Sequence, residues 1–152
     1  MNKRILAGAL LLIGGAMINR NNKPRGIRNN NPLNIRENGT KWLGRAGDDG
    51  AFVQFESASL GIRAAARILK NYRDKYGLNT VSGIINRWAP PVENDTNSYV
   101  NSVAKKTNVD VYQVLSDSDY PNLIRAMIYH ENGQQPYTNQ VINDGFKAGF
   151  YA

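Results

Sequence analysis

Glu131 stands in the stretch "MIYHENGQQPY", at the end of an apolar run and two residues before a glycine. Ile124, Met127 and Ile128 precede it by seven, four and three residues, so helical spacing turns the carboxylate toward the apolar face. Partial burial and the negative end of a helix dipole both disfavour its charged form and predict a raised pKa. A carboxylic acid that stays protonated near neutral pH can protonate a glycosidic oxygen. The alternative is a glutamate at the helix rim, paired with a neighbouring cation.

Other carboxylates have competing structural interpretations. Glu93 and Asp95, in the loop "PPVENDT", could position substrate or water, although Asp95 could equally cap the next helix. Glu56 precedes a helix whose dipole would stabilise it. Asp48 and Asp49 are expected to be hairpin-turn residues. Glu131 therefore has the best claim to catalysis.

Aromatic and amide side chains could bind a sugar near Glu131. Trp88 and Tyr99 could stack on pyranose rings, or could pack in the core instead. Hydrogen bonds to N-acetyl groups could come from five residues, which local backbone capping would also explain: Asn31, Asn34, Gln134, Gln135 and Tyr137. His130 is expected on the outward side of its helix.

Periodicity and capping signals predict a mainly helical domain with one small β-hairpin around "GDDG". The expected helices are Ser57 to Tyr76 before Gly77, a second from Thr80 to the Pro90–Pro91 pair, a third capped by Asp95 or Thr96, and a last long one in "SDYPNLIRAMIYHENG". The segment "DVYQVL" is expected to form a short helical turn. "NNNPLNIR" is expected to form tight asparagine turns, because asparagine tolerates left-handed backbone.

The N-terminus combines Lys3 and Arg4 with an uncharged run from Ile5 to Ile18, the layout of a membrane anchor or signal sequence. An uncleaved anchor, a cleaved signal and a buried helix all remain open. Residues 1–22 are assigned to this segment and residues 23–152 to one domain that begins near Arg25. The polar stretch from Asn19 to Asn31 is expected to be a linker.

The composition of the chain limits the kinds of partner and cofactor that the protein is expected to bind. The chain has 152 residues, a net charge of +7 and no cysteine, which excludes disulfides and thiolate metal sites. With a single histidine, neither a metal nor another cofactor is expected. The positive charge favours a polyanion, namely nucleic acid, acidic lipid or the bacterial cell wall.

Three segments resemble lysozyme-like lytic transglycosylases and bacterial glucosaminidases. The first segment is "HENG", which is similar to the "ESG" that ends the catalytic helix of those families. The second is "NNNPLNIR" with "FVQFESASLGIRAAARILKNY", which resembles their turn, hairpin and serine-capped helix. The third is "WAPPVENDTNSYVNSVAKK", which resembles their later aromatic and "Tyr-Val" helix segment. The likeness spans Arg25 to about Tyr137. The glutamate helix comes first in those families and follows the other pieces here, as a circular permutation would arrange it.

The resemblance implies an α+β lysozyme-like fold with Glu131 as general acid. The absence of a second compelling carboxylate favours a lytic transglycosylase over a simple hydrolase. The implied protein is a virion-associated or prophage enzyme that degrades peptidoglycan during phage entry or lysis. Its catalytic domain is expected outside the cytoplasm, attached to a membrane by the N-terminal helix. Other virion proteins are expected as further partners. The alternatives are a peptidoglycan endopeptidase on the same fold and a non-enzymatic basic virion protein; no nucleic-acid motif accompanies the positive charge.

Overall fold

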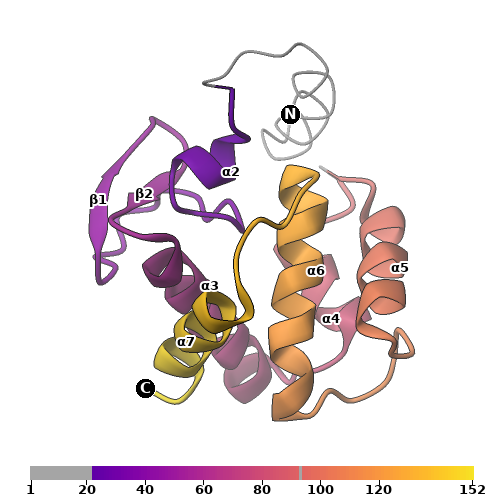
Figure 1. Ribbon diagram of the computed structural model, residues 1–152. Helices are drawn as coiled ribbons and strands as arrows, with labels where there is room; N and C mark the ends of the chain where they lie inside the picture. The colour runs from indigo at the N-terminus through magenta and orange to yellow at the C-terminus, as the bar shows by residue number, and fades with distance from the viewer. Residues whose placement is uncertain (1–21, 93) are drawn as a thin grey trace.

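The computed structural model describes residues 22–92 and 94–152, which form a mainly helical domain with one two-stranded sheet (Figure 1). The mainly helical prediction with a single small hairpin is confirmed. The expected N-terminal hydrophobic helix and Glu93 lie outside the described residues. Within the described ranges, no helix combines the length and apolar character needed to cross a bilayer.

The described chain opens with the short helix α2 (Arg25–Arg28), not with the extended linker predicted as far as Asn31. The backbone N–H of Arg28 donates to the Pro24 carbonyl at 2.9 Å and closes the single turn of this helix. Asn30 and Asn34 adopt left-handed backbone, with φ of 51° and 53°. The predicted asparagine turns are therefore confirmed, because asparagine occupies this region at little cost.

Two short strands form the predicted hairpin. β1 (Arg45–Asp48) pairs antiparallel with β2 (Val53–Phe55), with Asp48 opposite Val53 and a bulge between Arg45 and Gly47. Val53 and Phe55 point into the core, while β1 is largely exposed. The sheet thus buries one strand and leaves the other at the surface.

Side-chain caps start the next three helices where the sequence predicted them. α3 (Ala58–Tyr76) begins after Ser57, whose hydroxyl accepts from the Leu60 N–H at 3.2 Å, and ends at Gly77 with φ of 64°. α4 (Val81–Trp88) is capped by Thr80, and α5 (Thr96–Thr107) by Asp95. Each cap satisfies a backbone donor that the first helical turn would leave without a partner.

Further along the chain, the structure differs from the sequence-based predictions at the segment "DVYQVL" and at the C-terminus. "DVYQVL" forms one isolated turn rather than helix: the Gln113 N–H donates to the Asp110 carbonyl at 3.1 Å, and the Tyr112 N–H donates to the Asp110 carboxylate at 2.9 Å. A short 3₁₀ turn, η1 (Asp117–Asp119), then leads into α6 (Tyr120–Asn132), which has the predicted bounds. A further helix, α7 (Asn139–Phe150), was not anticipated.

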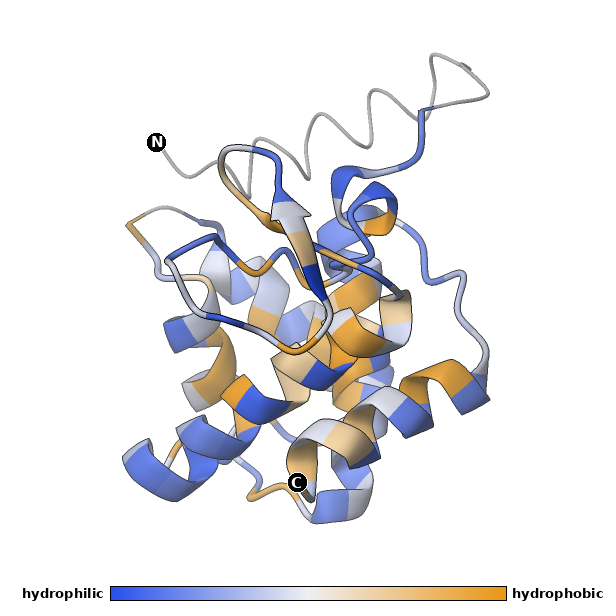
Figure 2. Ribbon diagram, turned by 90° about the vertical axis from the view of Figure 1, so that its left-hand side faces the viewer, coloured by the Kyte–Doolittle hydropathy of each residue, from blue (hydrophilic) through white to orange (hydrophobic). Residues whose placement is uncertain are grey.

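α7 packs against α3, while α5 and α6 pack side by side in the other half of the domain (Figure 1). The α3–α7 contact is close because Gly145 and Gly149 face it: a Cβ on Gly145 would lie 2.7 Å from Cγ2 of Ile62. The helices direct apolar residues inward and polar residues outward (Figure 2). This packing leaves the C-terminal end of α6 beside α2, where Glu131 lies.

Candidate active site

Glu131 lies on the last turn of α6 and is only 6% exposed. Ile124, Met127 and Ile128 on the same helix are fully buried, which confirms the predicted inward orientation of the carboxylate. The helix ends at Gly133, where φ is 71° and the backbone N–H donates to the Tyr129 carbonyl at 2.7 Å. The carboxyl group therefore lies buried at the end of the helix that carries the partial negative charge of the helix dipole.

The next residue, Asn132, joins this turn to a distant part of the chain and was missed by the sequence analysis. Its Nδ2 donates to the carbonyl of Pro32 at 2.7 Å and to that of Ile128 at 2.9 Å. Pro32 is 100 residues away in sequence. The side chain, 3% exposed, therefore attaches the end of α6 to the asparagine turn.

Asn34, a predicted substrate-binding residue, belongs to that same turn and is fully buried. Its Oδ1 and the Oδ1 of Asn132 both face Gly26: a Cβ built on Gly26 would lie 2.9 Å from the first and 2.6 Å from the second. Asn31 holds the turn itself, donating to the carbonyls of Ile35 and Val53. The structure thus brings Asn34 to the residue beside Glu131.

His130, on the other side of Glu131 in sequence, is not the outward surface residue that was predicted. Its ring stacks on Tyr99 of α5, with centroids 3.8 Å apart and planes 23° from parallel. Burial lowers the pKa of His130, and the negative charge of Asp95 opposes that shift. The correction follows from tertiary packing, because α5 covers this side of α6.

Trp88, Asp95 and Tyr99, three further residues that were predicted to bind substrate, have structural roles. Tyr99 is 2% and Trp88 5% exposed, and the ring of Trp88 packs edge-on against Tyr72 of α3. Both aromatics are thus core residues, and Tyr99 is connected to the Glu131 turn through the ring of His130. Asp95 caps α5, the alternative that the sequence left open.

The loop after α6 contains the last three predicted binding residues. Gln134 is exposed, whereas Gln135 is half-buried and accepts from the Tyr137 N–H at 2.6 Å. Burial raises the pKa of Tyr137 to about 12, so its phenol stays protonated at physiological pH. The loop leads directly away from Glu131 along the chain, but among these three only Gln134 offers a freely accessible side chain.

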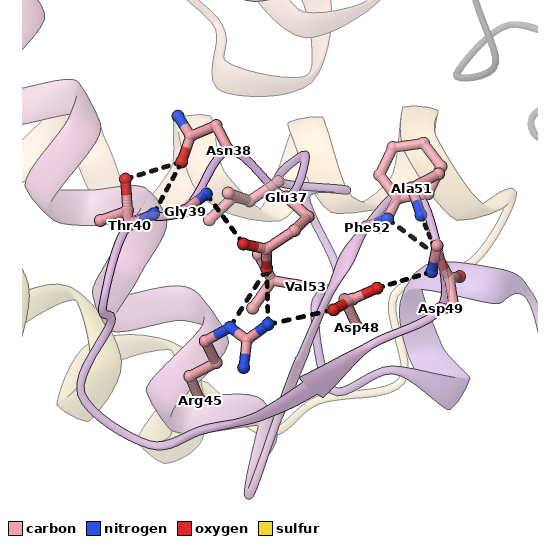
Figure 3. Close-up of polar contacts among 12 residues, drawn as sticks. Glu37, Asn38, Gly39, Thr40, Arg45, Asp48, Asp49, Ala51, Phe52 and Val53 are labelled. Carbon is pink, nitrogen blue, oxygen red and sulfur yellow. Dashed lines mark hydrogen bonds and ion pairs between the residues drawn. The ribbon is translucent and has the colours of Figure 1, made fainter.

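The carboxylates of the hairpin have structural roles, as predicted for Asp48 and Asp49 (Figure 3). Asp49 accepts from the backbone N–H groups of Ala51 and Phe52 and from the side chains of Arg25 and Asn29. Burial alone would raise the pKa of Asp49, but these hydrogen bonds outweigh it and lower the pKa from 3.8 to about 2. A carboxylate with so low a pKa is no proton donor at neutral pH.

Glu37 and Asp48 also have structural roles, because both carboxylates bind the same arginine. Arg45 donates to the Glu37 carboxylate at 3.1 Å and to the Asp48 carboxylate at 3.0 Å (Figure 3). Among residues 22–92 and 94–152, no group of three or more histidine, aspartate or glutamate side chains is placed to hold a metal ion. The described site thus consists of the buried carboxyl group of Glu131 and the asparagine turn that Asn132 joins to it.

Comparison with known proteins connects the chain to a bacterial virus. No family model matches it. Protein P5 of Pseudoalteromonas phage PM2 is 51% identical over 136 residues, which cover 86% of this chain and 85% of the phage protein. The chain belongs to the family of phage PM2 protein P5. The alignment covers most of both P5-family proteins, so the relationship is one of whole chains rather than of a shared short motif.

Proposed function

We propose that this protein is a phage-derived, lysozyme-like enzyme that cleaves the glycan strands of peptidoglycan, with Glu131 as its general acid. The observation that carries the proposal is the position of one carboxyl group, 6% exposed, on the final turn of an apolar helix. Such a group is suited to remain protonated near neutral pH and to protonate the oxygen of a departing sugar.

The roles of the other carboxylates support a single-acid mechanism. Asp49 is ion-paired with Arg25, Asp95 caps α5, and Asp48 accepts from the Gly50 N–H. Each is engaged in holding backbone or an arginine, so none of these three resembles the second carboxylate that glycoside hydrolases generally use. This favours a lytic transglycosylase over a hydrolase.

In such a reaction Glu131 gives its proton to the glycosidic oxygen as the C1–O bond breaks. The resulting carboxylate then removes a proton from a hydroxyl group of the same sugar, whose oxygen attacks C1 and closes an anhydro ring. The proton returns to Glu131, and no water is consumed. The phage relative and the positive charge of +7 fit a protein that meets an acidic cell wall, and the N-terminal uncharged run would hold it at a membrane.

Mass analysis of fragments released from purified peptidoglycan tests the proposal. Anhydro sugar ends are expected for a lytic transglycosylase, whereas reducing ends with one added water indicate a hydrolase. New amino groups would instead identify an endopeptidase. Intact peptidoglycan after prolonged incubation with folded protein would exclude all three activities.

A further inference from the structure

We infer that Asn132 is a positioning residue for Glu131, and that it works as part of a polar latch formed by Gly26, Pro32, Asn34 and Asn132. This inference rests on the proposed function, because it assigns a role within that reaction. Asn132 is not proposed to touch substrate. Its role is to fix the backbone of the turn that presents the carboxyl group.

The first step of the argument is the direction of the Asn132 hydrogen bonds. One N–H of the carboxamide returns to the Ile128 carbonyl, one turn back along α6, and the other crosses to the Pro32 carbonyl. A helix end is ordinarily free to fray, since its last carbonyls lack partners within the helix. Here the same side chain closes the turn and attaches it to a second segment.

The second step is the rigidity of that segment. The turn that carries Pro32 is itself held by Asn31, whose carboxamide donates to Ile35 and Val53 and accepts from the Ile35 N–H at 2.9 Å. Asn31 is fully buried. The anchor point for Asn132 is therefore connected to the hairpin strand β2 rather than to a mobile loop.

The third step is the tight fit around Gly26. A Cβ at this position would lie 2.6 Å from the Asn132 Oδ1, 2.9 Å from the Asn34 Oδ1 and 2.9 Å from the Asn31 carbonyl oxygen. Real Cβ atoms do not approach oxygens so closely, so only glycine leaves the carboxamide where it is. Gly26 and Asn132 thus provide two independent ways to disturb the latch, one steric and one chemical.

The consequence for Glu131 follows from its place in the chain. It lies directly before Asn132, so any displacement of the latch moves the proton donor relative to a bound glycosidic oxygen. Misplacement of a catalytic group by about 1 Å can cost about 100-fold in rate. Substrate affinity depends on other contacts and should change little.

Asn132→Ala, Gly26→Ala and the control Asn122→Ala test the inference in the full-length protein. Asn122 is an exposed asparagine on the same helix, where it accepts from Arg125. On purified peptidoglycan, kcat should fall about 10- to 100-fold in both latch variants, with KM within about twofold of wild type. Asn122→Ala should match wild type. Unchanged kcat in a folded Asn132→Ala protein overturns the inference, as does an equal loss in the control.

A second measurement does not require turnover. Carbon-13 NMR of the Glu131 carboxyl group gives its titration midpoint, which should move by at least about 0.5 pH unit in both latch variants and stay constant in Asn122→Ala. If wild type cleaves no peptidoglycan, the proposed function fails, and an unchanged midpoint then overturns the latch separately. If the Asn132→Ala variant does not fold, the Asn132→Ser variant replaces it in the experiment, because serine retains one hydrogen-bond donor. Its kcat should then lie between that of wild type and the value expected for Asn132→Ala.

Discussion

The carboxylate of Asp49 accepts a hydrogen bond from the Nε of Arg25 at 2.6 Å, joining the hairpin turn to the first described helix. The Arg25 guanidinium also lies 4.7 Å from the centre of the Phe52 ring. These contacts connect segments that are 24 residues apart. The hairpin and the segment that supports the Glu131 turn are therefore one structural unit.

Asp49 should make stability depend on acid pH. Its pKa is about 2 in the folded protein against 3.8 for the free side chain, so the unfolded chain binds more protons between these values. Its contribution of about 2 kcal/mol should be complete above about pH 5 and be lost progressively as the pH falls through 2. Urea unfolding at pH 2 to 6 measures this. Asp49→Asn should flatten the profile in that window, whereas Asp48→Asn, in a more exposed pair, should leave it nearly unchanged.

Glu131→Gln should abolish most peptidoglycan cleavage while the fold survives. Glutamine nearly preserves the shape of the side chain but carries no transferable proton, so kcat should fall by about two to four orders of magnitude. Turnover assays with circular dichroism melting on the same samples provide the comparison. A folded Gln variant with activity near wild type, together with inactive Asp95 or Glu93 variants, would place the acid in the loop before α5.

The single histidine should titrate below the usual range. Burial against Tyr99 lowers the His130 pKa from 6.5, and Asp95 only partly opposes this. Because the folded pKa is depressed, the neutral ring stabilises the fold above pH 6.5, and this contribution is lost as the pH falls through the folded pKa. Proton NMR of the imidazole measures the midpoint directly. Tyr99→Ala should raise it toward 6.5; a wild-type midpoint above 6.5 would contradict the packing described.

Gly149→Ala should destabilise the domain. A Cβ there would overlap the Arg63 carbonyl oxygen and lie 2.8 Å from the Ala66 Cβ, so α7 would have to move away from α3. The expected loss is about 1 to 3 kcal/mol, the usual scale for overpacking. Ala148→Ser, on the exposed side of the same helix, should change the free energy of unfolding by less than about 0.5 kcal/mol. Equal stability of the two variants would show that the helices tolerate wider separation.

Removal of residues 1–21 should leave the domain folded and change its location. The described backbone hydrogen bonds of α2, such as that from the Arg28 N–H to the Pro24 carbonyl, join residues that the shortened chain retains. Thermal melting should therefore match that of the full-length protein. Membrane flotation should recover the full-length protein with lipid and the shortened one without it, since the uncharged run from Ile5 to Ile18 would be gone. Recovery of both the full-length and the shortened protein without lipid would contradict the prediction of an N-terminal membrane anchor.

Local signals in the sequence determined most of the secondary structure. Ser57, Thr80 and Asp95 could be identified as caps, and Gly77 and Gly133 as helix ends, because capping depends on residues within one turn. The inward orientation of Glu131 followed from helical periodicity alone. Even α7 had a readable signal, with Thr138 as cap and Ile142, Phe146 and Phe150 four residues apart.

Tertiary structure alone decided what surrounds Glu131. His130 was expected at the surface, and only the packing of α5 on α6 places Tyr99 against it. The contact between Asn132 and Pro32 spans 100 residues, and no local pattern in a single sequence specifies which distant carbonyl a carboxamide will reach. Periodicity indicates which face of a helix is buried, whereas the partner on that face is selected by the packing of the whole chain.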